Sequence, residues 1–187
     1  MENLIGVVLC GGQSKRMGRD KGLLDLDGKS WALCIAEKLK KANLPIVISI
    51  NEKQQETYEK IFPDIPLIVD QLPIDGPLDG LLSIHRNFPE KDILLMACDL
   101  IDMQQETILS LIHSYKENPA FEYYVYVQQG FTQPFCAIYT AKGLAQVYKR
   151  FEENSLNKYS LHDRFESGNT LYIPVANDES FKNYNKL

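Results

Sequence analysis

The sequence predicts a three-layer α/β fold, in which helices cover both faces of a mostly parallel central sheet. Three observations lead to this prediction. Short apolar runs alternate with amphipathic stretches as far as residue 118, and the runs have the length of strands. The first run, LIGVVL, is apolar at nearly every position, as a strand covered on both faces must be. After residue 119 β runs follow one another, which indicates a mixed or antiparallel addition.

The first part of the chain contains four predicted strands with a helix after each. The strands are predicted over residues 4–9, 45–50, 66–70 and 92–99. The helices are predicted over residues 30–43, 52–62, 77–88 and 103–118. Ser30 is the predicted N-cap of the first helix, because its hydroxyl can accept a bond from an N–H of the first turn. Glu56 and Lys60 form an i,i+4 pair, and Asp102 with Gln105 suggests a capping-box start.

The last part of the chain extends the sheet. Two β runs are predicted within residues 120–140, around Gln128–Pro134, followed by a helix over 141–154, a strand over 170–176 and a closing helix over 178–187. Tyr123, Tyr124 and Tyr126 are interpreted as sheet packing rather than as a stacking surface for a ligand. Because the chain has neither a linker nor an internal repeat, we expect a single domain over residues 1–187.

Composition limits the function classes. The 187 residues are 44% hydrophobic with a net charge of −5, which argues against general binding to nucleic acid or to a membrane surface. No apolar run approaches the length of a membrane span, and the start of the chain is not typical of a signal peptide. The cysteines are widely spaced, which predicts free thiols and a cytoplasmic protein. They are Cys10, Cys34, Cys98 and Cys136, and the three histidines form no zinc pattern.

Residues 9–21, here called the N-terminal motif, combine two adjacent glycines with four cations and one acid, a local net charge of +3. They start where the first strand ends, and ligands of open α/β sheets bind beyond the carboxyl ends of the strands. Gly11 and Gly12 permit backbone N–H groups to approach an anion, which suggests a triphosphate ligand. A solvated basic loop explains the charge alone equally well. Neither the Walker pattern nor GxGxxG is present.

The spacing favours the ligand-binding interpretation. The residues L-C-G-G-x-S-x-R-M-G-x-D-K resemble the signature L-A-G-G-x-S-x-R-M-G-x-D-K of MobA-like molybdenum cofactor guanylyltransferases, and only Cys10 departs from it. DGPLDGLLSI (75–84), LLMACDL (94–100) and TQPFCAIY (132–139) resemble further family segments, in the family's order. Residues 154–165 match more loosely, and near the C-terminus only Asn177 is kept.

The resemblance implies a Rossmann-like nucleotidyltransferase fold and transfer of GMP from GTP to molybdopterin, with release of pyrophosphate and dependence on Mg²⁺. It implies GTP and molybdopterin as substrates, and proteins that deliver or receive the cofactor as candidate partners. Nucleic acid and membranes are not expected partners. Two alternatives stay open. The first is a cytidylyltransferase acting on molybdopterin, or another small-molecule nucleotidyltransferase of this fold. The second is a non-catalytic nucleotide-binding domain.

The resemblance also implies roles for residues of the motif segments. Leu9, which ends the first strand, is expected to bind GTP, and the amides of Cys10, Gly11 and Gly12 would hold phosphate oxygens. Arg16 and Lys21 would neutralise charge on the α-phosphate and the leaving pyrophosphate. Asp99, at the end of a strand, is the expected Mg²⁺ ligand, with a helix N-cap as its structural alternative. Asp20 and Asp102 are weaker candidates for the metal.

Further polar residues follow the second and third strands. Asp70 is expected to bind GTP, because a carboxylate can accept both the N1–H and N2–H₂ donors of guanine; a turn role before Leu72-Pro73 is the alternative. Asn51 either contacts the nucleotide or caps the helix that begins at Glu52. Asp79 is an unexplained acid in the GPLDG segment. For the acceptor, the candidate residues are Lys158 and Arg164, with solvated helix-surface charges as the alternative.

Overall fold

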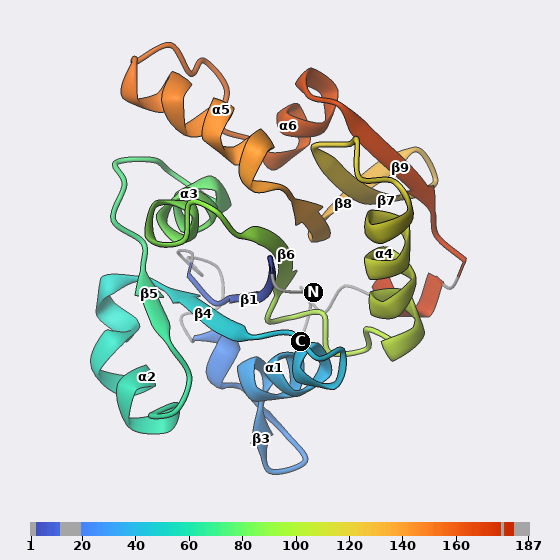
Figure 1. The fold of residues 1–187 in the computed structure, drawn as a ribbon. Coiled ribbons are helices and arrows are strands. Elements are labelled where there is room, and N and C mark those ends of the chain that lie inside the picture. The colour runs from blue at the N-terminus through green and yellow to red at the C-terminus, as the bar shows by residue number, and fades with distance from the viewer. Residues whose placement is uncertain (1–2, 12–19, 177, 182–187) are drawn as a thin grey trace.

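A computed structural model describes residues 3–11, 20–176 and 178–181. Within these residues the centre is a seven-stranded sheet of order β5-β4-β1-β6-β8-β7-β9 (Figure 1). Its strands are β1 (Leu4–Leu9), β4 (Ile46–Ile50), β5 (Leu67–Val69), β6 (Asp92–Ala97), β7 (Tyr123–Gln128), β8 (Phe131–Tyr139) and β9 (Thr170–Pro174). β8 runs antiparallel to β6 and β7, whereas the other neighbouring pairs are parallel. The predicted mostly parallel sheet with an antiparallel addition is confirmed.

Helices cover both faces of the sheet (Figure 1). One face is covered by α1 (Trp31–Lys41), α2 (Gln55–Ile61) and α4 (Gln105–Glu117), the other by α3 (Pro77–Asn87), α5 (Ala141–Glu152) and α6 (Leu161–Ser167). Alternate residues of a strand point to opposite faces of the sheet. Val8 therefore packs in the apolar cluster beneath α1, α2 and α4, whereas Val7 and Leu9 pack in the cluster beneath α3, α5 and α6. β1 is therefore apolar at nearly every position because both of its faces are buried.

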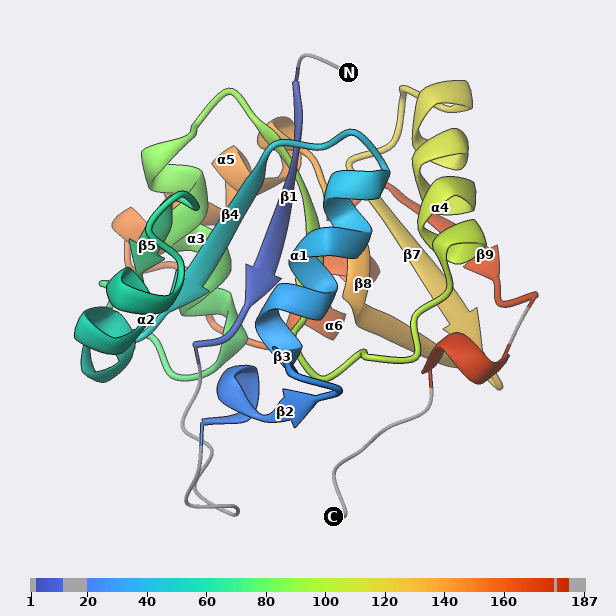
Figure 2. The same ribbon diagram turned by 90° about the horizontal axis from the view of Figure 1, so that it is seen from below.

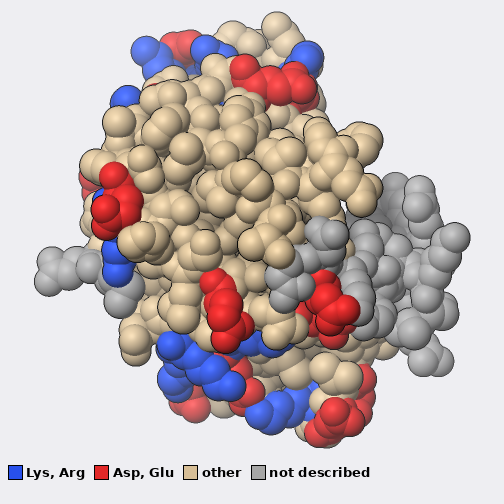
Figure 3. All heavy atoms as spheres, turned by 90° about the vertical axis from the view of Figure 1, so that its right-hand side faces the viewer, with Lys and Arg blue, Asp and Glu red and all other residues tan. Residues whose placement is uncertain are grey.

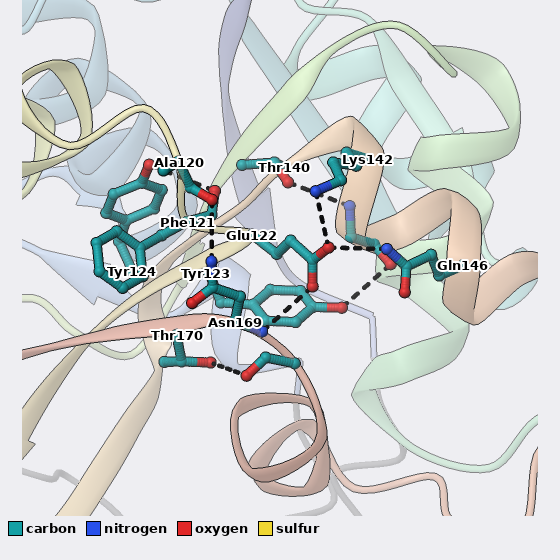
Figure 4. Close-up of polar contacts among 12 residues, drawn as sticks. Ala120, Phe121, Glu122, Tyr123, Tyr124, Thr140, Lys142, Gln146, Asn169 and Thr170 are labelled. Atoms are coloured by element: carbon teal, nitrogen blue, oxygen red, sulfur yellow. Dashed lines mark hydrogen bonds and ion pairs between the residues drawn. The ribbon is translucent and has the colours of Figure 1, made fainter.

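A buried carboxylate ties the end of the sheet to the helix layer. Glu122, just before β7, accepts hydrogen bonds from Gln146 Nε2 at 2.8 Å and from the Asn169 N–H at 3.2 Å (Figure 4). Its carboxylate also lies 3.2 Å from the Lys142 ammonium on α5. Burial raises the pKa of Glu122, but these three partners outweigh it and the pKa is lowered. The ionised carboxylate thus joins β7, α5 and the turn before β9.

β9 forms one edge of the sheet, on the side that Figure 3 shows. The centre of this side is largely uncharged, and charged side chains gather toward its upper and lower margins. Tyr172 of β9 is exposed, and β9 ends at Pro174, which has no N–H to donate. A proline at an edge limits pairing with a further strand.

The helix boundaries confirm some capping predictions and correct others. Ser30 caps α1 by accepting from the Leu33 N–H, as expected. Asp102 does not cap the next helix as predicted, because the N-cap residue of α4 is Gln104. The reason lies in Lys38, whose ammonium binds the carbonyl oxygens of Ile101 and Met103 and holds this stretch as a turn.

Several short elements were not predicted. They are β2 (Asp25–Leu26), β3 (Lys29–Ser30), α6 and the 3₁₀ helix η1 (Lys21–Leu23). The helix predicted over 52–62 begins at Glu52 as expected, but its first turn is the 3₁₀ helix η2 (Glu52–Gln54). The predicted closing helix is described only as the 3₁₀ turn η3 (Asp178–Phe181), and residues 182–187 lie outside the described residues. The three tyrosines of β7 are buried, and the four cysteines are free thiols, both as expected. No helix in the described part of the chain has the length and apolar character of a membrane span.

Candidate nucleotide-binding site

The predicted site residues meet at one edge of the sheet. β5, β4, β1 and β6 are neighbours and run parallel, so their carboxyl ends lie together. Figure 2 shows β1 and β4 pointing toward the end of the molecule where the β2–β3 hairpin lies. Asp70, Asn51, Cys10 and Asp99 each follow one of these strands closely. Strand order therefore brings together residues that are far apart in sequence.

A direct contact between two of the predicted site residues joins Lys21 to Asp99. The Lys21 Nζ donates to Asp99 Oδ2 at 3.0 Å, across 78 residues of sequence. η1 begins at Lys21, while Asp99 lies two residues beyond β6. The two side chains are 20% and 22% exposed. A cation and a carboxylate that reach solvent together at the carboxyl edge of a sheet can meet the phosphates of a ligand.

Asp70 lies two strands away from β1, directly after β5. Its Oδ1 accepts a hydrogen bond from Ser49 Oγ at 2.8 Å, and Ser49 itself is fully buried in β4. Burial raises the pKa of Asp70 to about 7, the Ser49 hydroxyl lowers it, and the nearby charge of Asp79 raises it. This carboxyl group therefore changes charge close to neutral pH, unlike an ordinary aspartate.

Gly11 and Gly80 make room for this carboxyl group. A Cβ atom on Gly11 would lie 2.1 Å from Asp70 Oδ2, and one on Gly80 would lie 2.6 Å from Ser49 Oγ. The amides of Cys10 and Gly11 both donate to the Ser49 carbonyl, at 2.9 and 3.0 Å. The expectation that these two amides hold phosphate oxygens is thus not met in this structure. Gly11 is needed for close approach to Asp70 instead.

The neighbouring polar residues have structural partners. Asn51 caps η2, since its side chain accepts from the Lys53 N–H, which supports the capping alternative. Asp79 accepts from the Leu72 N–H and from Ser83 Oγ, so it holds the turn after Asp70 and is no longer unexplained. The Leu9 side chain is buried, and its carbonyl accepts from the Cys98 N–H.

Asp20 is engaged by three donors from the protein. Its carboxylate accepts from the Gly22 N–H, from Gln54 Nε2 and from the Tyr58 hydroxyl. These contacts give Asp20 a structural role rather than that of a metal ligand. Gly12 and Arg16, two further predicted site residues, lie outside the described residues, as does Asn177.

The two candidate acceptor residues are also occupied. Lys158 Nζ lies 3.0 Å from Asp163 Oδ1 on the surface. Arg164 is buried, and its Nη2 donates to the Lys158 carbonyl at 2.9 Å. Arg164 therefore supports the segment before α6 and is not the solvated helix charge that the sequence suggested.

Sequence reasoning missed Ser49, Gln54 and Tyr58. Ser49 is a polar residue inside an otherwise apolar strand, which is a signal for a buried hydrogen bond. Gln54 stands three residues after Asn51, the spacing of a capping box. Tyr58 gives no comparable signal, because its position on an amphipathic helix is typical of ordinary core packing.

The described residues contain no group of three or more His, Cys, Asp or Glu that could hold a metal ion by itself. Asp99 nevertheless offers a partly exposed carboxylate beside the cation of Lys21. Mg²⁺ commonly takes one or two protein carboxylates, with substrate phosphates and water completing its shell. The residues present thus fit an ion that arrives with a phosphorylated ligand, and do not fit a preformed protein cage.

A mostly parallel sheet with helices on both faces, and with charged residues along its carboxyl edge, is the architecture of a Rossmann-like nucleotidyltransferase. The chain belongs to the MobA-like NTP transferase domain family, which matches residues 6–164. A solved structure of molybdopterin-guanine dinucleotide biosynthesis protein A from Archaeoglobus fulgidus has the same fold. Its TM-score is 0.76 at 19% identity, over 96% of this chain and 91% of that one.

Curated relatives in other organisms support this membership. A molybdenum cofactor guanylyltransferase from Campylobacter jejuni is 26% identical over 181 residues, which cover 96% of this chain and 89% of the relative. A molybdenum cofactor biosynthesis bifunctional protein from Synechocystis is 30% identical over 141 residues, or 75% of this chain. That match spans 40% of the longer Synechocystis protein.

Proposed function

We propose that this protein transfers GMP from GTP to molybdopterin and releases pyrophosphate. The observation that carries the proposal is the 3.0 Å contact between Lys21 and Asp99, which unites two motif segments at the carboxyl edge of the sheet. The names of the relatives, a molybdenum cofactor guanylyltransferase and a molybdopterin-guanine dinucleotide biosynthesis protein A, support the choice of substrates. The finer assignment to GTP rests on the physical argument about Asp70.

The donor nucleotide is proposed to lie across the carboxyl edge, with its base at β5 and its phosphates toward β6. Three strand spacings separate β5 from β6, a distance of roughly 14 Å at about 4.8 Å per spacing. The ionised Asp70 carboxylate accepts the paired N1–H and N2–H₂ donors of guanine. Cytosine lacks this donor pair, so the same carboxylate disfavours CTP. Ser49 holds the carboxylate in place.

The chemical step is a phosphoryl transfer without a covalent enzyme intermediate. A terminal phosphate oxygen of molybdopterin attacks the α-phosphorus of GTP, the bond from this phosphorus to the bridging oxygen breaks, and pyrophosphate leaves. Such a step depends on positioning and on charge neutralisation. The Lys21 ammonium, with Arg16 as a second cation, neutralises charge on the α-phosphate and on the leaving group.

Asp99 is the residue proposed to hold Mg²⁺. When bound there, the ion supplies positive charge to the triphosphate. Asp99 also orients the Lys21 ammonium, because the two groups share a hydrogen bond. The Asp99 carboxylate is therefore proposed to bind both Mg²⁺ and the Lys21 ammonium.

The direct test is product formation with purified protein, Mg²⁺ and molybdopterin, supplied with GTP, CTP or ATP in separate reactions. Mass spectrometry of the product and release of pyrophosphate are measured. The proposal predicts the guanine dinucleotide with GTP, and rates at least tenfold lower with CTP and ATP. A preference for CTP would replace the guanylyl assignment by a cytidylyl one. Nucleotide binding without pyrophosphate release would favour a non-catalytic domain.

A further inference from the structure

Gln54 connects the two flanks of the segment formed by residues 12–19. Its Nε2 donates to the Cys10 carbonyl at 3.2 Å, before this segment, and to Asp20 Oδ2 at 2.7 Å, after it. Cys10 and Asp20 are ten positions apart in the sequence, whereas Gln54 comes from η2, which follows β4. One side-chain amide therefore joins the point where the chain leaves β1 to the point where η1 begins.

The orientation of this amide is fixed by a third bond. Gln54 Oε1 accepts the Asn51 N–H at 2.8 Å, within the capping box of η2. With its oxygen facing a donor and its nitrogen facing two acceptors, the amide satisfies all three groups in one orientation only. A rotated amide would place a donor against the Asn51 N–H. The capping box of η2 thus fixes the Gln54 side chain in the orientation that binds the Cys10 carbonyl and the Asp20 carboxylate.

Asp20 is the second half of this connection. Besides Gln54, its carboxylate accepts from the buried Tyr58 hydroxyl at 3.1 Å and from the Gly22 N–H at 2.9 Å. Asp20 is the N-cap of η1, and the next residue is Lys21. Fixing the Asp20 carboxylate therefore fixes the backbone that carries the Lys21 ammonium toward Asp99.

From this chain of contacts we infer that Gln54 is a positioning residue for triphosphate binding. It acts through Asp20 on Lys21, and through the Cys10 carbonyl on the backbone that directly follows β1. The inference rests on the proposed function of the N-terminal motif, and it adds a residue that lies outside every motif segment. Gln54 makes no contact with the substrate in this role, so it tunes the affinity for phosphates rather than the chemistry itself.

The test compares two identical substitutions on neighbouring residues. Gln54→Met removes the amide but keeps an unbranched side chain of similar length. Gln55→Met is the matched control, because Gln55 is exposed and its amide donates to the exposed Glu59 on the same helix. Binding of GTP and of inorganic tripolyphosphate is measured by calorimetry, and folding is checked by thermal unfolding. We expect Gln54→Met to weaken binding of both ligands at least tenfold, and Gln55→Met to change it less than twofold.

Exchanging the amide and the carboxylate between Gln54 and Asp20 distinguishes a positioning role of Gln54 from a general loss of structure. Gln54→Glu places a carboxylate against that of Asp20, and we expect at least a tenfold loss of tripolyphosphate affinity. Adding Asp20→Asn restores a donor–acceptor pair, because the new amide nitrogen at position 20 can donate to the new carboxylate at position 54. The amide oxygen at position 20 can still accept from the Tyr58 hydroxyl and the Gly22 N–H. The double variant is expected to bind at least threefold more tightly than Gln54→Glu alone. The rescue is partial, because the Cys10 carbonyl is left without its amide donor.

The outcomes distinguish the inference from the proposed function. Unchanged affinity in Gln54→Met, or a double variant no better than Gln54→Glu, overturns the positioning role. A wild-type protein that binds tripolyphosphate but forms no guanine dinucleotide contradicts the proposed function, while the binding comparison still tests Gln54. A wild-type protein that binds neither GTP nor tripolyphosphate contradicts both.

Discussion

The Lys21 ammonium lies 3.0 Å from the Asp99 carboxylate, so the last residue of the N-terminal motif meets a residue that follows β6. Both side chains are about one-fifth exposed, and ion pairs that reach solvent contribute only about 0–1 kcal/mol to stability. Stability alone thus gives little reason for this pair. Its position at the carboxyl edge, where both charges can meet phosphates, gives a functional one.

Replacing Asp99 by Asn is expected to weaken the affinity of the active site for Mg²⁺. The amide keeps the shape of the side chain but loses the charge that a hard cation prefers. We expect the Mg²⁺ concentration for half-maximal pyrophosphate release to rise at least tenfold, while the thermal midpoint changes little. A matched control is Asp163→Asn, which removes a carboxylate from an ion pair at the surface. Equal Mg²⁺ curves for wild type and Asp99→Asn would remove Asp99 from the metal site.

Recognition of guanine is expected to depend on pH through Asp70. Its pKa is raised to about 7, and only the ionised carboxylate accepts both guanine donors. The affinity for GTP is therefore expected to rise with pH through 7, by up to about tenfold per unit below that value, and to level off above pH 8. Tripolyphosphate, titrated over the same range, is the control for ionisation of the phosphates and of the cations. If both ligands follow the same pH curve, Asp70 does not read the base.

Ser49→Ala is expected to move that pH profile. The Ser49 hydroxyl donates to Asp70 and lowers its pKa, so its removal leaves burial less opposed and raises the pKa further. At pH 7.5 we expect a loss of GTP affinity of about threefold, and a midpoint shifted to higher pH. Calorimetric titrations at several pH values provide the measurement. A midpoint that moves to lower pH would contradict the arrangement.

Gly11→Ala tests the close approach of the backbone to Asp70. The new Cβ would lie 2.1 Å from Asp70 Oδ2, so the carboxylate must move away from its place beside Ser49. We expect the affinity for GTP to fall at least tenfold and the preference over CTP to be lost. The double variant with Asp70→Ala relieves the clash, and it should regain thermal stability without regaining the preference. A Gly11→Ala protein with unchanged nucleotide preference speaks against the role of Asp70.

Replacing Glu122 by Gln is expected to destabilise the fold in a pH-dependent way. The pKa of Glu122 is lowered in the folded state, so its contribution is present above the unfolded pKa and is lost as pH falls through the folded value. Urea unfolding at pH 7 should show a loss of about 1–3 kcal/mol in the free energy of unfolding. The difference should shrink below about pH 4. Glu153→Gln, in an exposed pair with Lys149, is the control and should change little.

The strands and most helices could be predicted from the sequence because their signals are local. LIGVVL reads as a strand buried on both faces, and Val7 and Val8 do contribute to opposite apolar clusters. The start of α4 could not be predicted in the same way. The turn before it is held by Lys38, which comes from α1 and is remote in sequence. A boundary set by such a tertiary contact leaves no mark in the local pattern.

The candidate site, too, could be predicted only in part from the sequence. The motif segments identify Lys21 and Asp99, and the place of Asp70 directly after a predicted strand identifies that residue. Strand order then brings Asp70 and Asp99 to one edge of the sheet, where the Lys21 ammonium contacts Asp99. The reason for Gly11 differs from the expected one, since its amide is bound to Ser49 and its lack of a side chain serves Asp70. Contacts among β1, β4 and β5 decide this, and sequence spacing does not encode them.

The most direct measurement is the steady-state rate of guanine dinucleotide formation by wild type and Lys21→Met, with GTP, Mg²⁺ and molybdopterin. Lys29→Met, in an exposed pair with Glu37, is the control. Loss of one preorganised group that stabilises transition-state charge costs on the order of 10²–10³ in kcat. The account predicts such a fall in kcat/KM for Lys21→Met, with thermal stability and the rate of Lys29→Met close to wild type. A Lys21→Met enzyme that retains wild-type kcat/KM would contradict the account.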